Sequence, residues 1–136
     1  MKSKMGKSRI GLVVFFSSLS VIVNSCSPLP NAFQAGKAYI YQLERGELDA
    51  AVKMHSKRII NQAGIDSLRS ELSERPSIIK SAGGVKSLTA ESETVTGEVA
   101  EVIIKIEYGD GEIYRQFYRF IQEEGSWKID FSKQLE

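Results

Sequence analysis

Beyond residue 30, the first half of the chain repeats its apolar positions every three or four residues. This spacing gathers apolar side chains on one face of a helix, and it predicts helices over residues 31–44, 47–55 and 63–74. Gly46 fits the left-handed position that follows a helix end. Pro76 is expected to end the third helix, which leaves Ile78 and Ile79 in the connection that follows. In residues 56–61 the apolar positions follow neither the helical nor the alternating spacing, so no element is predicted there.

From residue 85 onward the apolar period changes from helical to alternating. Alternation puts apolar side chains on one face of a strand, and it is clearest over residues 98–108. The pattern predicts four strands, over residues 85–95, 98–108, 112–122 and 127–131. Gly-Asp-Gly at 109–111 and Glu-Gly at 124–125 supply the tight turns that join the later strands.

This order of elements predicts an α+β fold, with three N-terminal helices packed on a curved four-stranded antiparallel meander. Each strand pairs with its neighbour in the chain, so the topology needs no crossover. We expect a single domain over residues 31–136, because a chain of about 110 residues buries roughly two-thirds of its unfolded surface without needing a second core.

The N-terminal segment has a different pattern. Its basic residues, Lys2, Lys4, Lys7 and Arg9, precede an almost uninterrupted apolar run over residues 10–23. A basic leader followed by a short apolar run is typical of a secretory signal peptide. The run is shorter than the roughly 20 apolar residues that a helix needs to cross a bilayer. The segment therefore predicts export rather than a membrane span.

The apolar run ends in Val23-Asn24-Ser25-Cys26, which resembles the bacterial lipobox. Cys26 is the only cysteine, so it has no partner for an internal disulfide. The resemblance implies that residues 1–25 are removed as a lipoprotein signal peptide. It also implies that Cys26 carries two or three acyl chains, palmitate among them, and that residues 26–30 form a lipidated tether. An unmodified thiol beside an ordinary cleavage site is the alternative.

Lipidation would place the protein at the cell envelope. Two or more acyl chains hold a protein firmly on a membrane, since each buried methylene contributes roughly 0.8 kcal/mol. In an organism with two membranes, Ser27 after the cysteine implies the outer membrane, facing the periplasm. In an organism with one membrane, the protein would lie on the outer face of the plasma membrane.

Removal of the leader changes the charge balance. The chain has 18 basic and 17 acidic residues, and loss of the four basic leader residues leaves 14 against 17, a net charge of −3. Nucleic-acid binding requires a basic patch or stripe, so this mildly acidic domain is not expected to bind nucleic acid.

Few residues suggest catalytic or cofactor chemistry. His55 is the only histidine and Cys26 the only cysteine, so a zinc site of several His or Cys ligands is excluded. A general base at His55 is an alternative to a surface or capping role at a helix end. Asp49, Asp66 and Asp130 are the candidates for the single Asp base of a ketosteroid-isomerase-type site. Each of them is expected at an exposed or capping position instead. No glycine-rich phosphate loop occurs, and no cofactor, metal or catalytic residue is predicted.

Residues 30–132, nearly the whole mature chain, resemble small bacterial lipoproteins of the nuclear-transport-factor-2-like (NTF2-like), cystatin-like fold, some of them called lumazine-binding-like. The similarity rests on an ordered set of short motifs: Glu-Arg-Gly-Glu-Leu-Asp-Ala-Ala at 44–51, Tyr-Gly-Asp-Gly at 108–111 and Gly-Ser-Trp-Lys-Ile-Asp at 125–130. It implies a cone-shaped sheet wrapped around a helix, with a pocket at the wide end. On this fold the pocket serves isomerases, dehydratases, ligand binders and dimerisation domains, so function must be inferred from its lining.

The aromatic residues of the strands have two interpretations. In the last strand, Trp127, Ile129 and Phe131 alternate with polar residues and are expected to share a face. Together with Tyr114, Tyr118 and Phe120 they are expected to fill the core. Some of the aromatics would instead line the pocket and orient a small apolar ligand, the candidates being Tyr39, Tyr118, Phe120 and Trp127.

Two functions from different classes follow from the sequence. The first is a membrane-anchored, non-catalytic binding or interaction domain that holds a small apolar ligand or an envelope protein. A homodimer through the sheet is part of this hypothesis. The second is an enzyme of the isomerase or dehydratase type. Arg115 and Arg119 share a strand face with Phe117, where they would meet an anionic ligand or, as on an ordinary solvated face, acidic partners.

Overall fold

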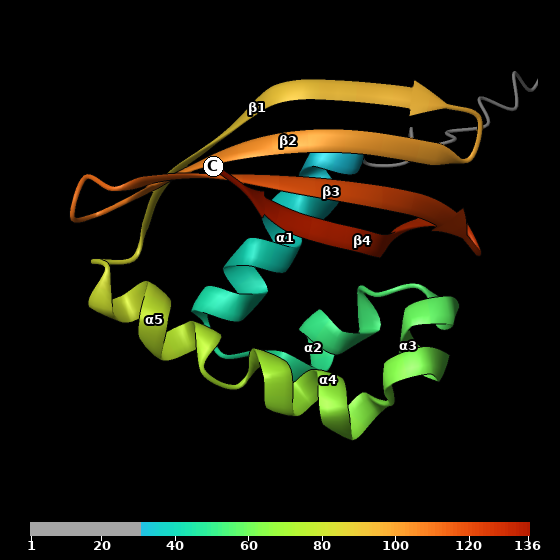
Figure 1. Ribbon diagram of the computed structural model, residues 1–136, viewed down its shortest axis with the longest axis horizontal. Helices are drawn as coiled ribbons and strands as arrows, with labels where there is room; N and C mark the ends of the chain where they lie inside the picture. The colour runs from blue at the N-terminus through green and yellow to red at the C-terminus, as the bar shows by residue number, and fades with distance from the viewer. Residues whose placement is uncertain (1–30) are drawn as a thin grey trace, which may run out of the picture.

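The computed structural model describes residues 31–136, which form five helices followed by four strands (Figure 1). The helices are α1 Ala32–Glu44, α2 Leu48–Lys53, α3 Lys57–Ala63, α4 Ile65–Leu72 and α5 Arg75–Ser81. The strands are β1 Val85–Thr96, β2 Val99–Tyr108, β3 Ile113–Glu123 and β4 Ser126–Leu135. The predicted signal peptide, Cys26 and the tether lie outside the described residues.

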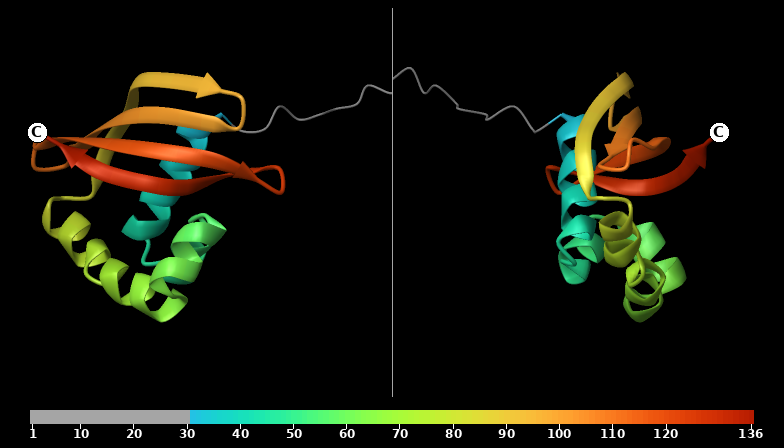
Figure 2. Two further views of the ribbon diagram at one scale, coloured as in Figure 1. Left: turned by 45° about the vertical axis from the view of Figure 1, so that its right-hand side comes forward. Right: turned by 90° about the vertical axis from the view of Figure 1, so that its left-hand side faces the viewer.

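The four strands form one antiparallel sheet in the order β1-β2-β3-β4, so every strand pairs with its neighbour in the chain. The predicted α+β class and the predicted meander are confirmed. The sheet curves around the helices, which all lie on its concave side (Figure 2). The curvature is accompanied by register shifts in two strands, two shifts in β1 and one in β4.

The helical half differs from the prediction of three helices. α3 occupies the segment that has no clear period, and α5 occupies the segment predicted to be a connection. Pro76 lies in the first turn of α5, where a missing N–H leaves no hydrogen bond unmade, so it begins a helix rather than ending one. Ile79 of α5 joins the core. Among residues 31–136, no helix is long and apolar enough to span a membrane.

Helix α1 lies along the concave face of the sheet and forms the centre of the core (Figure 1). Asn31 caps it, because the side-chain oxygen of Asn31 accepts a 2.8 Å hydrogen bond from the backbone N–H of Gln34. Gly36 lets the helix approach β2 closely, since a Cβ there would lie 2.5 Å from Cδ1 of Ile104. The fully buried side chains beneath α1 come mainly from β2, β3 and β4: Val102, Ile104, Phe120 and Ile129.

The prediction that Phe131 shares the core-facing side of β4 with Trp127 and Ile129 is wrong. Phe120 pairs with Ile129 and Arg119 with Phe131, so Asp130 is an extra residue in β4. This bulge reverses the alternation and turns Phe131 to the outer face of the sheet, where it is 45% exposed. There its ring contacts Phe117, with centroids 6.1 Å apart. Trp127 and Ile129 remain in the core, as expected.

Candidate functional site

A cavity of about 140 Å³ lies between the concave face of the sheet and the helices α1, α4 and α5. Its apolar lining comes from leucine and isoleucine side chains of the helices and from Ile106. Its polar lining is made by three tyrosines, His55, Gln116, Ser132 and a pair of charged residues. A small concave site with apolar walls and a few converging polar groups is the usual form of a ligand pocket.

Two buried tyrosines dominate the interior of this cavity. Tyr39 projects from α1 and Tyr118 from β3, and their rings meet edge to face with centroids 6.0 Å apart. Burial raises the pKa of Tyr39 to about 12 and raises that of Tyr118 well above its usual value. Both hydroxyls are therefore protonated at neutral pH. Neither has a hydrogen-bond partner among residues 31–136.

His55 is buried at the end of α2, against the edge of Tyr39, with ring centroids 5.4 Å apart. Its Nδ1 lies 3.1 Å from the carbonyl oxygen of Ala51 and 3.2 Å from that of Val52. A carbonyl oxygen only accepts hydrogen bonds, so the hydrogen-bond network assigns the proton to Nδ1 and leaves a lone pair on Nε2. Burial lowers the pKa of His55, which keeps the ring neutral. The residue caps α2 as expected, but it is not on the surface.

The position of His55 is fixed by β4. The backbone N–H of Ile129 donates a 2.7 Å hydrogen bond to the carbonyl of Met54, and the N–H of Ser56 donates a 2.8 Å bond to the carbonyl of Ile129. His55 thus pairs with β4 as an isolated bridge. It also borders a second, shallower hollow of about 360 Å³ beside Ile59 and Phe131, which shares His55, Leu68, Glu71 and Ser132 with the cavity.

Two exposed charges lie at the mouth of the cavity, Glu71 on α4 and Arg75 on α5. The positive charge of Arg75 acts to lower the pKa of Tyr39, Tyr108 and Tyr118, against the larger effect of burial. Arg75 and these three tyrosines line the same cavity. The charge of Glu71 instead raises the pKa of Tyr39 and of His55. None of the ion pairs within residues 31–136 involves Arg75.

Of the four residues predicted to line a pocket, Tyr39 and Tyr118 line this cavity. Phe120 and Trp127 do not, because both are core residues on the far side of Tyr118, farther along the sheet. Sequence reasoning missed Arg75 and Gln116. Gln116 lies two residues before Tyr118 on the same strand face, so alternation alone could have identified it. Arg75 was hidden because the segment that carries it was predicted to be the end of a helix.

The three candidate acids lie elsewhere. Asp49 and Asp66 are exposed and pair with Arg69. Asp130 accepts hydrogen bonds from Ser56 and Arg58. None of the three lines the cavity, where the only acid is Glu71. Within residues 31–136, no group of three or more His, Cys, Asp or Glu side chains is arranged to hold a metal ion.

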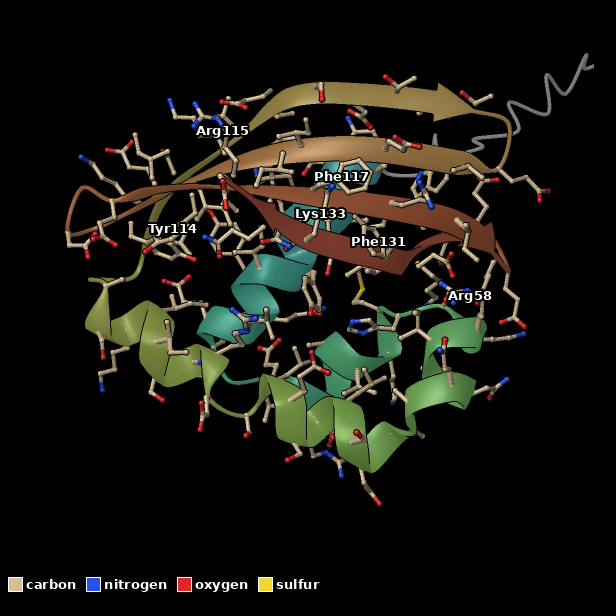
Figure 3. The ribbon with its side chains drawn as sticks, viewed as in Figure 1. Arg58, Tyr114, Arg115, Phe117, Phe131 and Lys133 are labelled. Atoms are coloured by element: carbon tan, nitrogen blue, oxygen red, sulfur yellow. The ribbon has the colours of Figure 1, made fainter. Side chains whose placement is uncertain are left out.

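The outer face of the sheet carries a row of aromatic and basic side chains over β3 and β4 (Figure 3). Arg119 lies over the ring of Phe131 and Lys133 over that of Phe117, each 6.0 Å from the centroid. The two arginines predicted to share this face have acidic partners, Glu91 for Arg115 at 3.0 Å and Glu101 for Arg119 at 3.6 Å. Such pairs are typical of a solvated face.

No protein-family model matches the sequence, and no curated protein matches it. Several solved structures match, three of which follow. A Campylobacter jejuni protein provisionally described as an NTF2-like transpeptidase superposes with a TM-score of 0.66 at 14% identity, covering 75% of this chain and 99% of the other. A SEC-C motif containing protein from Rhodopseudomonas palustris gives 0.52 at 12%, covering 75% and 77%. An NTF2-like protein of unknown function from Silicibacter pomeroyi gives 0.48 at 14%, covering 75% and 91%.

Identity this low carries the fold and nothing about activity. The structural similarity to the Campylobacter protein covers almost all of that chain, and it agrees with the helix-wrapping curved sheet described above. Residues 31–136 therefore have an NTF2-like fold.

Proposed function

We propose that the chain is an exported lipoprotein, anchored at the cell envelope through Cys26, whose NTF2-like domain binds a small molecule in the cavity. The observation that carries the binding proposal is the pair of buried tyrosine hydroxyls, on Tyr39 and Tyr118, that lack hydrogen-bond partners. Each hydroxyl can donate a hydrogen bond, and no acceptor among residues 31–136 receives it. A ligand that accepts hydrogen bonds would pair with both.

The hydroxyls are reachable from the cavity. Among residues 31–136, Oε1 of Gln42 is the only buried side-chain polar atom that is both sealed and unpaired. The hydroxyl oxygens of Tyr39 and Tyr118 also have no partner, but they do not belong to this fully buried class. Solvent therefore reaches both oxygens. Both residues line the cavity, so access to their hydroxyls is through it. An interior site open to solvent and rich in hydrogen-bond donors favours ligand binding over a purely structural core.

The charges of the cavity favour binding over catalysis. An isomerase of the ketosteroid type needs a buried acid beside its tyrosine donors. The only acid that lines this cavity, Glu71, is exposed at the mouth. His55 supports the enzyme alternative, because its neutral ring offers Nε2 as a base. Loss of a measured isomerase or dehydratase activity in a His55→Gln variant would favour that alternative.

Native mass spectrometry of the protein purified from membranes tests the binding proposal. We expect an added mass that disappears on denaturation. Gln116 and Gln134 pair across β3 and β4, but only Gln116 lines the cavity. Gln116→Trp should therefore fill the cavity and remove the added mass, while the matched control Gln134→Trp should keep it. Retention of the same mass by both variants would place the ligand elsewhere and contradict the proposal.

The outer face of the sheet supports a second role within the same hypothesis, self-association into a homodimer. Phe131 is 45% exposed and packs on Phe117, with basic side chains on either side. Aromatic residues are enriched at the centres of protein interfaces. An aromatic pair on a solvent-facing sheet is consistent with a twofold contact of this kind.

A further inference from the structure

We infer that the cavity takes a small planar carboxylate, a ring of about the size of benzene that bears one carboxylate group. This inference rests on the proposed ligand-binding function and names the class of ligand. It follows from three properties of the site: the hydrogen-bond donors inside the cavity, the position of the charges at its mouth, and its size.

The donors require an acceptor. Tyr39 and Tyr118 present two protonated hydroxyls inside the cavity, and Tyr108 brings a third, half-buried hydroxyl from the end of β2. The two buried hydroxyls have no acceptor among residues 31–136. A carboxylate is acceptor-only and has room for several donors at once. Hydrogen bonds to an ionised acceptor are roughly twice as strong as neutral ones.

The positive charge of Arg75 at the mouth of the cavity favours a ligand whose negative charge lies near the tyrosines. Arg75 lines the same cavity as all three tyrosines and makes no ion pair within residues 31–136. A guanidinium presents a planar fork of donors that matches a carboxylate. The opposing charge, Glu71, acts on His55 and Tyr39 but not on Tyr108 or Tyr118, and His55 adds no positive charge. A cation would be drawn toward Glu71, away from the hydroxyls of Tyr108 and Tyr118.

The size of the cavity limits the rest of the ligand. A protein cavity of about 150 Å³ holds one benzene molecule, and the cavity here is about 140 Å³. The edge-to-face pair of Tyr39 and Tyr118 offers aromatic edges and faces to a planar ring. A single ring with its carboxylate directed toward Arg75 satisfies both the volume and the donors, whereas a sterol-sized ligand would not fit.

Three isosteric probes separate charge from shape: benzoate, benzamide and benzamidine, which are anionic, neutral and cationic at pH 7. The lipid-bearing full protein is reconstituted in nanodiscs, and binding is measured by saturation-transfer NMR titration against empty nanodiscs. We expect benzoate to bind at least about fivefold more tightly than either other probe, the difference expected for one charge-assisted hydrogen bond.

Two variants locate the carboxylate. Arg75→Gln should weaken benzoate about tenfold and bring it level with benzamide. Lys80→Gln, an exposed charge removal on the same helix that does not line the cavity, should leave benzoate binding unchanged. Tyr118→Phe keeps the buried ring and removes one donor, so it should weaken benzoate several-fold without a comparable effect on benzamidine.

The outcomes distinguish the inference from the function on which it rests. Tighter binding of benzamide or benzamidine than of benzoate would overturn the carboxylate while leaving a ligand-binding cavity in place. Equal weakening of benzoate by Arg75→Gln and Lys80→Gln would also overturn it, since a general charge effect would then explain the preference. If none of the probes binds, the inference is overturned. The proposed function fails only if native mass spectrometry also shows no added mass that depends on Gln116.

Discussion

Ser56 Oγ donates a 2.7 Å hydrogen bond to Oδ1 of Asp130, joining two residues that lie 74 positions apart in the chain. Ser56 also caps α3, because its Oγ accepts a 3.2 Å hydrogen bond from the N–H of Ile59. Asp130 is the extra residue of the β4 bulge. One buried hydroxyl thus ties the start of a helix to the irregularity that sends Phe131 to the outer face of the sheet.

Replacement of Ser56 with alanine should destabilise the domain by about 1–3 kcal/mol. The variant loses a helix cap, which contributes about 1 kcal/mol, and leaves Asp130 without one of its donors. Chemical denaturation measures the change. Ser73→Ala is a suitable control, because its hydroxyl is exposed and bonds only to the carbonyl of Ser70. An effect at Ser56 no larger than that at Ser73 would contradict the role assigned to the bond.

Acidification should destabilise the fold through His55. Burial lowers the pKa of this side chain in the folded state. Below an unfolded-state pKa of about 6.5, the unfolded chain binds a proton that the folded chain does not. Stability should therefore fall as the pH drops below about 6.5, with a slope of at most about 1.4 kcal/mol per pH unit, and level off below the folded-state pKa.

Paired denaturation curves of the wild type and His55→Gln between pH 5 and 8 test this dependence. The range brackets the unfolded-state value of about 6.5. The free energy of unfolding of the variant should depend less steeply on pH below about 6.5, because the histidine no longer contributes. A difference between the two proteins that stays constant over the whole range would show that His55 titrates alike in both states.

Gly36→Ala should be destabilising although alanine favours helices. In an exposed helix position, alanine is preferred to glycine by about 1 kcal/mol. At Gly36 the added Cβ would meet Ile104 Cδ1 at 2.5 Å in the core, and overpacking of this kind typically destabilises by about 1–3 kcal/mol. Thermal or chemical denaturation measures the sign of the change in stability. Ala38→Gly, on the exposed side of α1, measures the intrinsic preference of this helix for alanine over glycine. A gain in stability at Gly36 would mean that Ile104 moves aside freely.

The sequence predicted those parts of the fold that depend on local periodicity. The strands and the meander follow from alternation and Asp-Gly turns, which are local properties. The face of Phe131 did not follow, because the bulge at Asp130 depends on Ser56 and Arg58, which are remote in sequence. A helix at α5 was missed because Pro76 suits both the end of one helix and the first turn of another.

The candidate site was predictable only in part, for a similar reason. Tyr39 and Tyr118 could be proposed from their aromatic character and strand or helix face. Arg75 could not, because its place in the cavity lining depends on how α5 packs beneath the sheet. The burial of His55 depends on its bridge to Ile129 of β4, a contact between segments that no local pattern links.

Lipidation of Cys26 predicts a covalent label. Cells grown with an alkyne analogue of palmitate should incorporate it into the wild-type protein, and Cys26→Ser should abolish the incorporation, because no other cysteine is present in the chain. Ser27→Ala is the matched control and should still be labelled. Retained label in Cys26→Ser would place the acyl group on another residue, whereas an unlabelled wild-type protein would leave an ordinary exported protein as the explanation of the leader.

Self-association through the outer sheet face predicts a specific sensitivity to Phe131. In a twofold interface the same surface of both copies meets itself, so each substitution acts twice. Phe131→Ser should weaken the dimer by about a thousandfold, since a central aromatic anchor commonly contributes about 2 kcal/mol and two such anchors are lost. Sedimentation velocity over a concentration series measures this. Ile65→Ser removes a comparably exposed apolar side chain, 52% exposed on α4 against 45% for Phe131, and should leave the dimer unchanged. A wild-type protein that stays monomeric at all concentrations would exclude the dimer and leave the outer face to a different partner.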